Sequence, residues 1–231
     1  MRRLLAAAAG LLLALAGCSA DGGSPRADTV SVSPSATPSP TAGAATEAQL
    51  AGALLAVGDL PTGWSVDDDE DDDDEDPIQG CPELAALDDR IGERPNAEVS
   101  FARAELGPFF SESAGTFRDA GDAAAAVRRL THALGSCPSF TYTDDDGKKQ
   151  RARIAALSFP QVGDETFAAR MSVEFEGGRI SVDFAVVRVR QHVLLLAGTS
   201  VTTVFGGGQL DPADLERLVR AAVTKASGAL P

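Results

Sequence analysis

Apolar and polar side chains alternate with a period of two along residues 166–176, and again along residues 179–190. Gly177 and Gly178 lie between the two segments and suit a tight turn, so the pattern predicts a β-hairpin with one buried face. That face consists of alternate apolar residues from both segments: Phe167, Ala169, Met171, Val173, Phe175, Ile180, Val182, Phe184 and Val186.

Five other segments have the composition of strands and are bounded by turn residues: 97–106, 108–117, 139–143, 150–159 and 192–203. Segments 139–143 and 150–159 flank the sequence DDDGKK and are predicted to form a second hairpin. Segment 192–203, HVLLLAGTSVTT, is more apolar than the others, and we expect it near the centre of the sheet.

Helical periodicity is clearest over residues 119–137, and Gly135 is expected to end this helix. Its apolar stripe consists of Ala123, Val127, Leu130 and Leu134. A second helix is predicted over residues 210–227, with Asp211 as its N-cap and Pro212 in its first position.

Two shorter helices are predicted ahead of the strands. One has Thr46 as its N-cap, and its apolar face consists of Leu50, Leu54 and Val57. The other covers residues 81–92, with Pro82 in its first turn. The turn sequence LPTGW lies between them, and Trp64 is expected to pack on the core.

Helices that bracket a run of strands joined by short turns imply an α+β domain. The expected architecture is an antiparallel sheet of about five to seven strands with helices packed on it. We expect the C-terminal helix to cover the apolar face of the hairpin.

The chain begins with Arg2 and Arg3, followed by thirteen apolar residues, 4–16. A transmembrane helix needs about 20 apolar residues, so this run is typical of a secretory signal peptide over residues 1–17. The sequence LAGC, which ends at Cys18, resembles the lipobox of bacterial lipoproteins. That resemblance implies cleavage before Cys18 and a lipid on its thiol, which would anchor the protein to the extracytoplasmic face of the cell membrane. The alternative is an ordinary cysteine in an ordinary signal peptide.

Residues 18–46 are rich in Ser, Thr, Pro, Gly and Ala and show no apolar periodicity. This composition predicts a disordered tether between the lipid anchor and a folded domain. The domain is then expected to cover residues 47–231, which is long enough for one hydrophobic core.

The formal net charge is −14 at pH 7, and ten consecutive acidic residues, 67–76, account for most of the excess. The sequence has no cluster of Lys and Arg residues of the kind that binds nucleic acid, so nucleic acid is not an expected partner. The acidic run lacks the spaced ligands and the glycine of a calcium-binding loop, which favours a solvated loop. Weak binding of cations or of a cationic partner is the alternative. The acidic residues 144–146 are interpreted as a hairpin turn.

Cys81 and Cys137 are the two cysteines that remain once Cys18 carries lipid. In an oxidising compartment, two cysteines that precede prolines at the ends of elements are predicted to form a disulfide. A redox or metal site would need a CxxC spacing or further ligands, and the sequence offers neither. No metal is therefore expected.

Two histidines, His132 and His192, are the candidates for acid–base chemistry. His132 is expected on the solvent side of its helix and His192 at a strand turn. Neither has an Asp or Glu at a sequence spacing that would indicate a catalytic pair. The sequence has no G-x-S-x-G, HExxH, phosphate-loop or dinucleotide-binding motif. We therefore expect a protein that is not an enzyme and holds no cofactor.

The chain contains four segments that resemble actinobacterial lipoproteins of the sensor-domain type: LLAVGDLPTGWSV, AAAAVRRLTHALGSCPSF, VGDETFAARMSVEF and VVRVRQHVLLLAGTS. Those proteins are similar to the extracellular sensor domain of mycobacterial serine/threonine kinases, and the resemblance covers residues 47–227. It implies an antiparallel sheet flanked by helices, a cleft over the sheet and an unidentified ligand. The chain has one candidate cysteine pair where the kinase sensors use two disulfides. It also lacks a kinase domain and a transmembrane helix, so we expect any signal to pass through a partner.

Two classes of function follow from these observations. The first is a lipid-anchored binding or sensor module for an unknown small ligand, and the second is a structural or protein-interaction lipoprotein of the envelope. A ligand would be expected on the polar face of the first hairpin: Arg170, Ser172, Glu174, Ser181, Asp183 and Ala185. Arg170 is the candidate contact, because a guanidinium can hold a carboxylate or phosphate with two bonds. A plain solvated face is the alternative.

Overall fold

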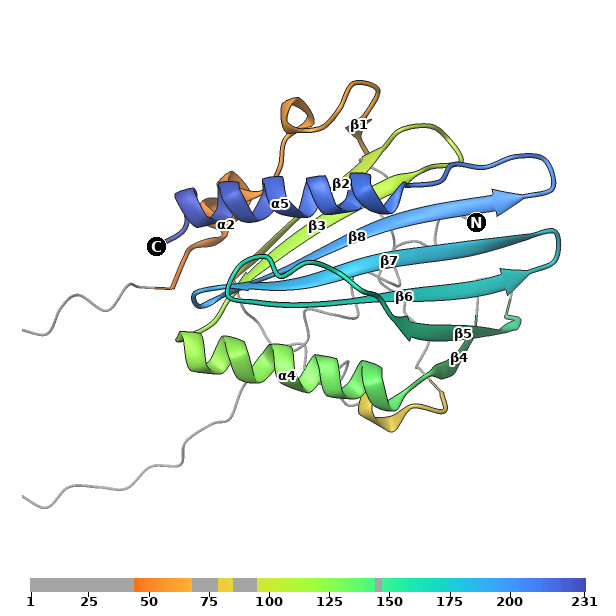
Figure 1. The fold of residues 1–231 in the computed structure, drawn as a ribbon, viewed down its shortest axis with the longest axis horizontal. Helices are drawn as coiled ribbons and strands as arrows, with labels where there is room; N and C mark the ends of the chain where they lie inside the picture. The colour runs from red at the N-terminus through yellow and green to blue at the C-terminus, as the bar shows by residue number, and fades with distance from the viewer. Residues whose placement is uncertain (1–43, 68–78, 85–94, 144–146) are drawn as a thin grey trace, which may run out of the picture.

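An antiparallel sheet of eight strands runs through the protein (Figure 1). The computed structural model describes residues 44–67, 79–84, 95–143 and 147–231. The α+β class is confirmed, whereas the expected strand number of about five to seven is slightly low. The eighth strand is β1 (Ser65–Val66), and a pair of residues is too short to give an alternation that sequence analysis could detect.

The other seven strands overlap the seven predicted segments, although β2 ends four residues and β5 three residues before the predicted ends. Their bounds are β2 (Asn96–Ala102), β3 (Phe109–Thr116), β4 (Ser139–Thr143), β5 (Lys149–Ala156), β6 (Glu165–Phe175), β7 (Gly178–Val189) and β8 (His192–Thr203). The order across the sheet is β1-β2-β3-β8-β7-β6-β5-β4. Strand β8 is therefore central, as predicted, and helices pack on both of its faces, which explains its nearly continuous apolar sequence.

The helical elements whose bounds the described residues give are α2 (Glu47–Ala53), the 3-10 helix η2 (Val57–Asp59), α4 (Ala120–Ser136) and α5 (Pro212–Ala229). The predicted caps are present, because the side chains of Thr46 and Asp211 accept hydrogen bonds from backbone N–H groups of the first turns of α2 and α5. Of the helix expected over residues 81–92, residues 82–84 are helical and 85–92 lie outside the described residues. Among the described residues, no helix combines the length and apolar composition that a bilayer-spanning segment requires.

The first helix is shorter than its periodicity predicts. It ends at Ala53, and Val57 belongs to η2, where its side chain is 40% exposed. The reason is a tertiary contact: the backbone N–H of Leu55 donates to the carboxylate Oε2 of Glu112 on β3, at 2.8 Å. That hydrogen bond takes the place of the next one along the helix.

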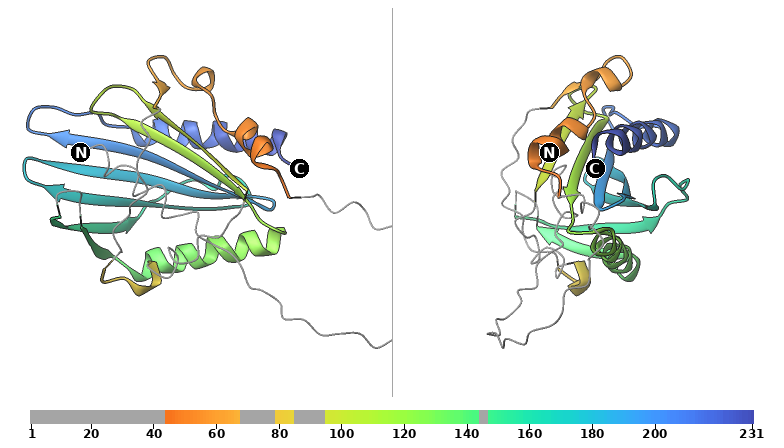
Figure 2. Two further views of the ribbon diagram at one scale, coloured as in Figure 1. Left: turned by 180° about the vertical axis from the view of Figure 1, so that it is seen from behind. Right: turned by 90° about the vertical axis from the view of Figure 1, so that its left-hand side faces the viewer.

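Two hydrophobic cores lie on opposite faces of the sheet. Figures 1 and 2 show the helices that accompany the sheet. Helix α4 packs on the face that carries Val182, Phe184 and their neighbours. Helices α2 and α5 pack on the other face, together with Trp64, which is buried as expected. The prediction that the C-terminal helix covers the apolar face of the hairpin is therefore wrong.

Close packing behind β8 explains this placement of α5. After β8 the chain returns along the opposite face of the sheet, and Leu210 and Leu215 pack against Gly198. A Cβ at Gly198 would overlap the terminal methyl group of Leu210, so a larger residue there would displace that side chain from its packed position. The apolar stripe of α5 specifies that one side of the helix is buried, but it does not specify which face of the sheet buries it.

Candidate functional site

The sheet face beneath α5 has an apolar half and a polar half. The apolar half lies under α5 and α2 and includes Ala168, Ala185 and Val187. Further along the same strands, side chains on this side are polar or charged and belong to neither core. We call this polar half the open face, and it includes Lys149, Arg151, Arg153, Arg170, Ser172, Glu174, Arg179, Ser181 and Asp183.

Arg170, the candidate ligand contact, is already engaged by a carboxylate of its own chain. It lies directly opposite Asp183 in the β6–β7 ladder, and the two side chains form a bidentate ion pair. The Nε–Oδ1 distance is 2.5 Å and the Nη2–Oδ2 distance is 2.6 Å. Asp183 raises the pKa of Arg170 through this hydrogen bond, so the guanidinium stays charged. An external anion would meet the outer edge of Arg170, because the fork itself faces Asp183.

The strand β5 contributes three cationic side chains to the open face that sequence reasoning missed. Lys149, Arg151 and Arg153 are exposed and project on the same side of β5. The ion pairs among the described residues give none of the three a carboxylate partner. The alternation in KQRAR contains the signal, because residues at i, i+2 and i+4 of a strand share one face.

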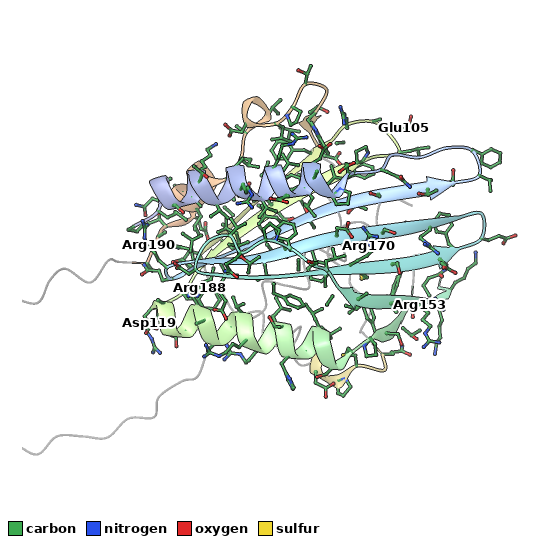
Figure 3. All side chains as sticks on the ribbon, viewed as in Figure 1. Glu105, Asp119, Arg153, Arg170, Arg188 and Arg190 are labelled. Atoms are coloured by element: carbon green, nitrogen blue, oxygen red, sulfur yellow. A yellow bond between two sulfur atoms is a disulfide. The ribbon has the colours of Figure 1, made fainter. Side chains whose placement is uncertain are left out.

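The remaining charges of the open face are paired with each other. Arg179 and Glu174 lie opposite one another in the β6–β7 ladder, with Nη2 and Oε1 2.6 Å apart. Both side chains are largely exposed, so this pair contributes little to stability. Figure 3 labels Arg153 and Arg170, which lie on the neighbouring strands β5 and β6.

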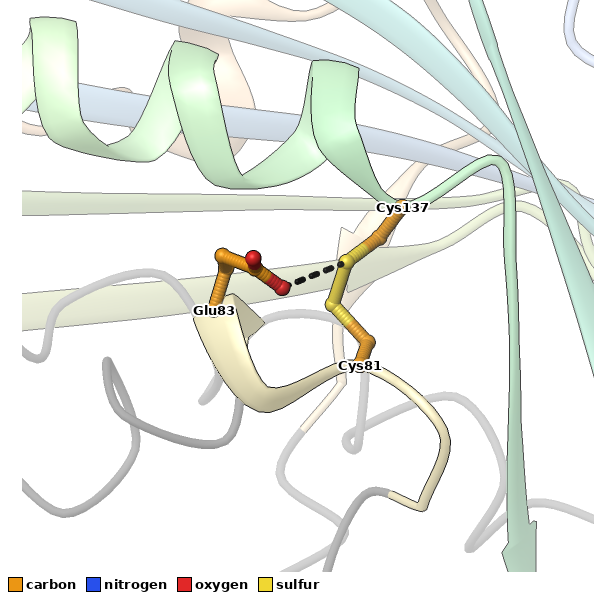
Figure 4. Close-up of side chains that lie close together, drawn as sticks. All are labelled: Cys81, Glu83 and Cys137. Carbon is orange, nitrogen blue, oxygen red and sulfur yellow. Dashed lines mark hydrogen bonds between the residues drawn. A yellow bond between two sulfur atoms is a disulfide. The ribbon is translucent and has the colours of Figure 1, made fainter.

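Cys81 and Cys137 form the predicted disulfide (Figure 4). Their Cα atoms are 5.8 Å apart, and the bond joins the end of α4 to residues 79–84, where Gln79 pairs with Thr141 of β4. The disulfide joins residues 56 positions apart and so lowers the entropy of the unfolded chain. On the loop-closure model this stabilises the folded chain by about 4 kcal/mol.

A carboxylate lies next to this disulfide. The Oε2 atom of Glu83 is 3.7 Å from Sγ of Cys137, and with Cys81 these residues would supply three donor atoms to a metal. Because the two sulfur atoms are bonded to each other, neither is a thiolate, which is the form that binds metals. The cluster therefore has a structural role.

The two histidines lie in different environments. His132 is on the exposed side of α4, as expected. His192 opens β8 and is completely buried, with its Nε2 3.3 Å from the carbonyl oxygen of Pro231. Burial lowers the pKa of His192, which favours the neutral ring.

Glu112 is a buried carboxyl that sequence reasoning also missed. Its Oε2 accepts the hydrogen bond from Leu55, while its Oε1 has no hydrogen-bond partner among the described residues. Burial raises the pKa of Glu112 to about 7. Nothing in the alternation of β3 marks this residue, because its burial comes from α2 packing over that part of the sheet.

Several predicted features lie outside the described residues. These are Cys18 with the signal peptide, the tether up to residue 43, residues 68–76 of the acidic run and residues 144–146. The strands on either side of 144–146 do pair as an antiparallel hairpin, as predicted.

No protein-family model and no curated protein matches the sequence. A similar solved structure is the extracellular domain of PknH from Mycobacterium tuberculosis, with a TM-score of 0.60 and 14% sequence identity. The match covers 81% of this chain and all of that domain. At this identity the comparison establishes a shared fold, and it confirms the fold that the sequence resemblance implied.

Proposed function

We propose that this protein is an extracytoplasmic, sensor-like binding module, held at a membrane by a lipid on Cys18, and that its ligand binds the open face. The main support is the open face itself, where polar and cationic side chains lie beside a well-packed apolar half. The fold shared with the extracellular domain of PknH is consistent with this placement outside the cytoplasm. The lipobox-like sequence LAGC supports the anchor.

Binding rather than catalysis is the chemistry that the described residues favour. His192 is buried in the core, and His132 is exposed on α4, the helix on the far side of the sheet from the open face. The charged groups of the open face include Arg170 and Asp183, which form an ion pair suited to orienting a ligand.

Native mass spectrometry of the protein purified from its own cells tests the proposed function. We expect a non-covalent adduct that is lost in Arg170→Ala, because the substitution removes a cation and leaves Asp183 to repel an anion. The control Arg217→Ala removes an exposed arginine from α5 and should keep the adduct. An adduct retained by both variants would place the ligand elsewhere on the molecule.

The double variant Arg170→Ala/Asp183→Ala separates the two effects of losing Arg170. If binding returns in the double variant, Arg170 acts by neutralising Asp183. If binding stays absent, Arg170 contacts the ligand itself.

A second candidate function is protein interaction within the cell envelope. The observation that favours it is the loop after β8, where Val204 is 77% and Phe205 is 95% exposed. Large apolar residues that gather on a surface mark interaction sites. Leu106 is also exposed, and it lies beside this loop because its carbonyl oxygen accepts a hydrogen bond from the backbone N–H of Gly208. A photo-reactive residue at position 205 should then cross-link one discrete protein in intact cells, whereas the same residue at position 118 should not.

A further inference from the structure

One cross-strand row of the open face consists almost entirely of hydroxyl side chains. The pairing of the strands places five residues side by side, one from each of the neighbouring strands β4, β5, β6, β7 and β8. In that order they are Ser139, Arg153, Ser172, Ser181 and Ser200. We call these five residues the serine row. Side chains opposite each other in an antiparallel sheet lie about 5 Å apart, so the row is continuous across five strands.

The centre of the serine row differs from its two ends in its hydrogen bonds. Ser139 accepts a hydrogen bond from Nη2 of Arg151 at 3.0 Å, and Ser200 accepts one from the backbone of Leu210 at 3.0 Å. The side chains of Arg153, Ser172 and Ser181 have no hydrogen-bond or ion-pair partner among the residues that the structure describes. The outer hydroxyls are therefore used by the protein, whereas the central three groups are available to a ligand.

The charges around the serine row are asymmetric. On one side lies the Arg170–Asp183 pair and on the other the Glu174–Arg179 pair, and each pair neutralises itself. Arg153 within the row has no carboxylate partner among the described residues, and Arg151 lies two residues away along β5. Within the described part of a chain of net charge −14, these two arginines give the row a local excess of positive charge.

We propose that the serine row binds an anionic carbohydrate, a glycan that carries carboxylate or phosphate groups. Serine hydroxyls both donate and accept hydrogen bonds and so match sugar hydroxyls, while the guanidinium of Arg153 can hold an acidic group with two parallel bonds. Protein partners use large apolar side chains as anchors, and such side chains also insert into lipid surfaces. The serine row has no such side chain. This inference rests on the proposed function, because it names the ligand class of the same open face.

The test is a titration of the full, isotopically labelled chain, followed through its backbone amide NMR signals. The anionic glycans are oligogalacturonate, which carries carboxylates, and a phosphomannan oligosaccharide, which carries phosphates. A neutral maltodextrin of matched length, inorganic phosphate and phosphatidylglycerol vesicles are separate arms. We expect at least one anionic glycan to shift the signals of Ser172 and Ser181, and the neutral glycan to leave them unchanged.

Three variants assign the contact. Arg153→Gln should weaken binding of the anionic glycan about tenfold or more, because it removes a charge-assisted bidentate contact. Ser172→Val adds a branched side chain that suits a strand and should weaken binding without changing charge. Arg217→Gln on the outer side of α5 is the matched control and should bind as the unmodified chain does.

The outcomes separate the glycan inference from the proposed function. Equal binding of neutral and anionic glycans, or binding that Arg153→Gln leaves intact, overturns the glycan inference while the open face stays a binding site. Signal shifts caused only by vesicles or only by inorganic phosphate also overturn it and assign a lipid headgroup or a simple anion instead. If no arm perturbs the serine row and the native adduct survives Arg170→Ala, both the inference and the proposed function are wrong.

Discussion

The buried carboxyl of Glu112 should make the stability of this domain depend on pH. It lies on β3 beneath α2, with one oxygen hydrogen-bonded to Leu55 and the other without a partner among the described residues. Burial raises its pKa to about 7, even though the nearby Lys225, ion-paired to Asp59, favours the charged form. The substitution Glu112→Gln keeps the size of the side chain and its acceptor for Leu55 but removes the titration.

The direction and size of the effect follow from the two pKa values. Below the ordinary value of 4.5, the carboxyl is protonated in the folded and the unfolded chain, and its contribution to stability is fully present. As the pH rises, the unfolded chain ionises first, so the contribution falls and is lost once the pH passes about 7. The difference between the two pKa values corresponds to about 3 kcal/mol.

This contribution can be measured by urea unfolding. The unmodified chain and Glu112→Gln are compared between about pH 4 and about pH 8. We expect the free energy of unfolding of the variant to rise relative to the unmodified chain by about 3 kcal/mol across that range. Other titrating groups are common to both proteins and cancel in the difference. The exposed Glu105→Gln serves as control and should give a difference that is nearly flat with pH. A flat difference for Glu112→Gln as well would refute the reasoning.

Three further predictions concern segments outside the open face. Cys18→Ser should abolish lipid attachment and release the protein from the membrane fraction; normal cleavage and retention of the variant would show that Cys18 is no anchor. Replacing Cys81 and Cys137 together by alanine should lower the free energy of unfolding by up to about 4 kcal/mol, measured under non-reducing conditions. Deleting residues 67–76 should change the melting temperature by only a few degrees, because an acidic run has no apolar groups to pack. A calcium-dependent rise in melting temperature that disappears with the deletion would instead establish an ion site.

Local pattern accounts for most of the secondary structure. The alternation around Gly177 predicted β6 and β7, and the caps Thr46 and Asp211 predicted the starts of α2 and α5. These features depend on residues close in sequence, whose side-chain spacing is fixed by strand and helix geometry. The end of α2 depends instead on Glu112, a residue 57 positions away from Leu55, and it was missed for that reason.

The candidate site shows the same division at the level of single residues. The sequence correctly identified Arg170 as a charged side chain on the polar face of the hairpin, but its partner Asp183 is set by the register of β6 against β7. The serine row likewise requires four strand pairings to be known together. Taken alone, each serine of the row is an ordinary strand serine, and Arg153 is an ordinary exposed strand arginine.

The sequence by itself determined the α+β class, the seven longer strands, the helix caps and the pairing of Cys81 with Cys137. Only the tertiary structure decided that α4 and α5 cover opposite faces of the sheet. An amphipathic helix specifies that it buries one side, but the face that receives it depends on close packing such as that at Gly198. The open face is the part of the sheet that α5 leaves uncovered, so its position follows from that packing and not from any local pattern.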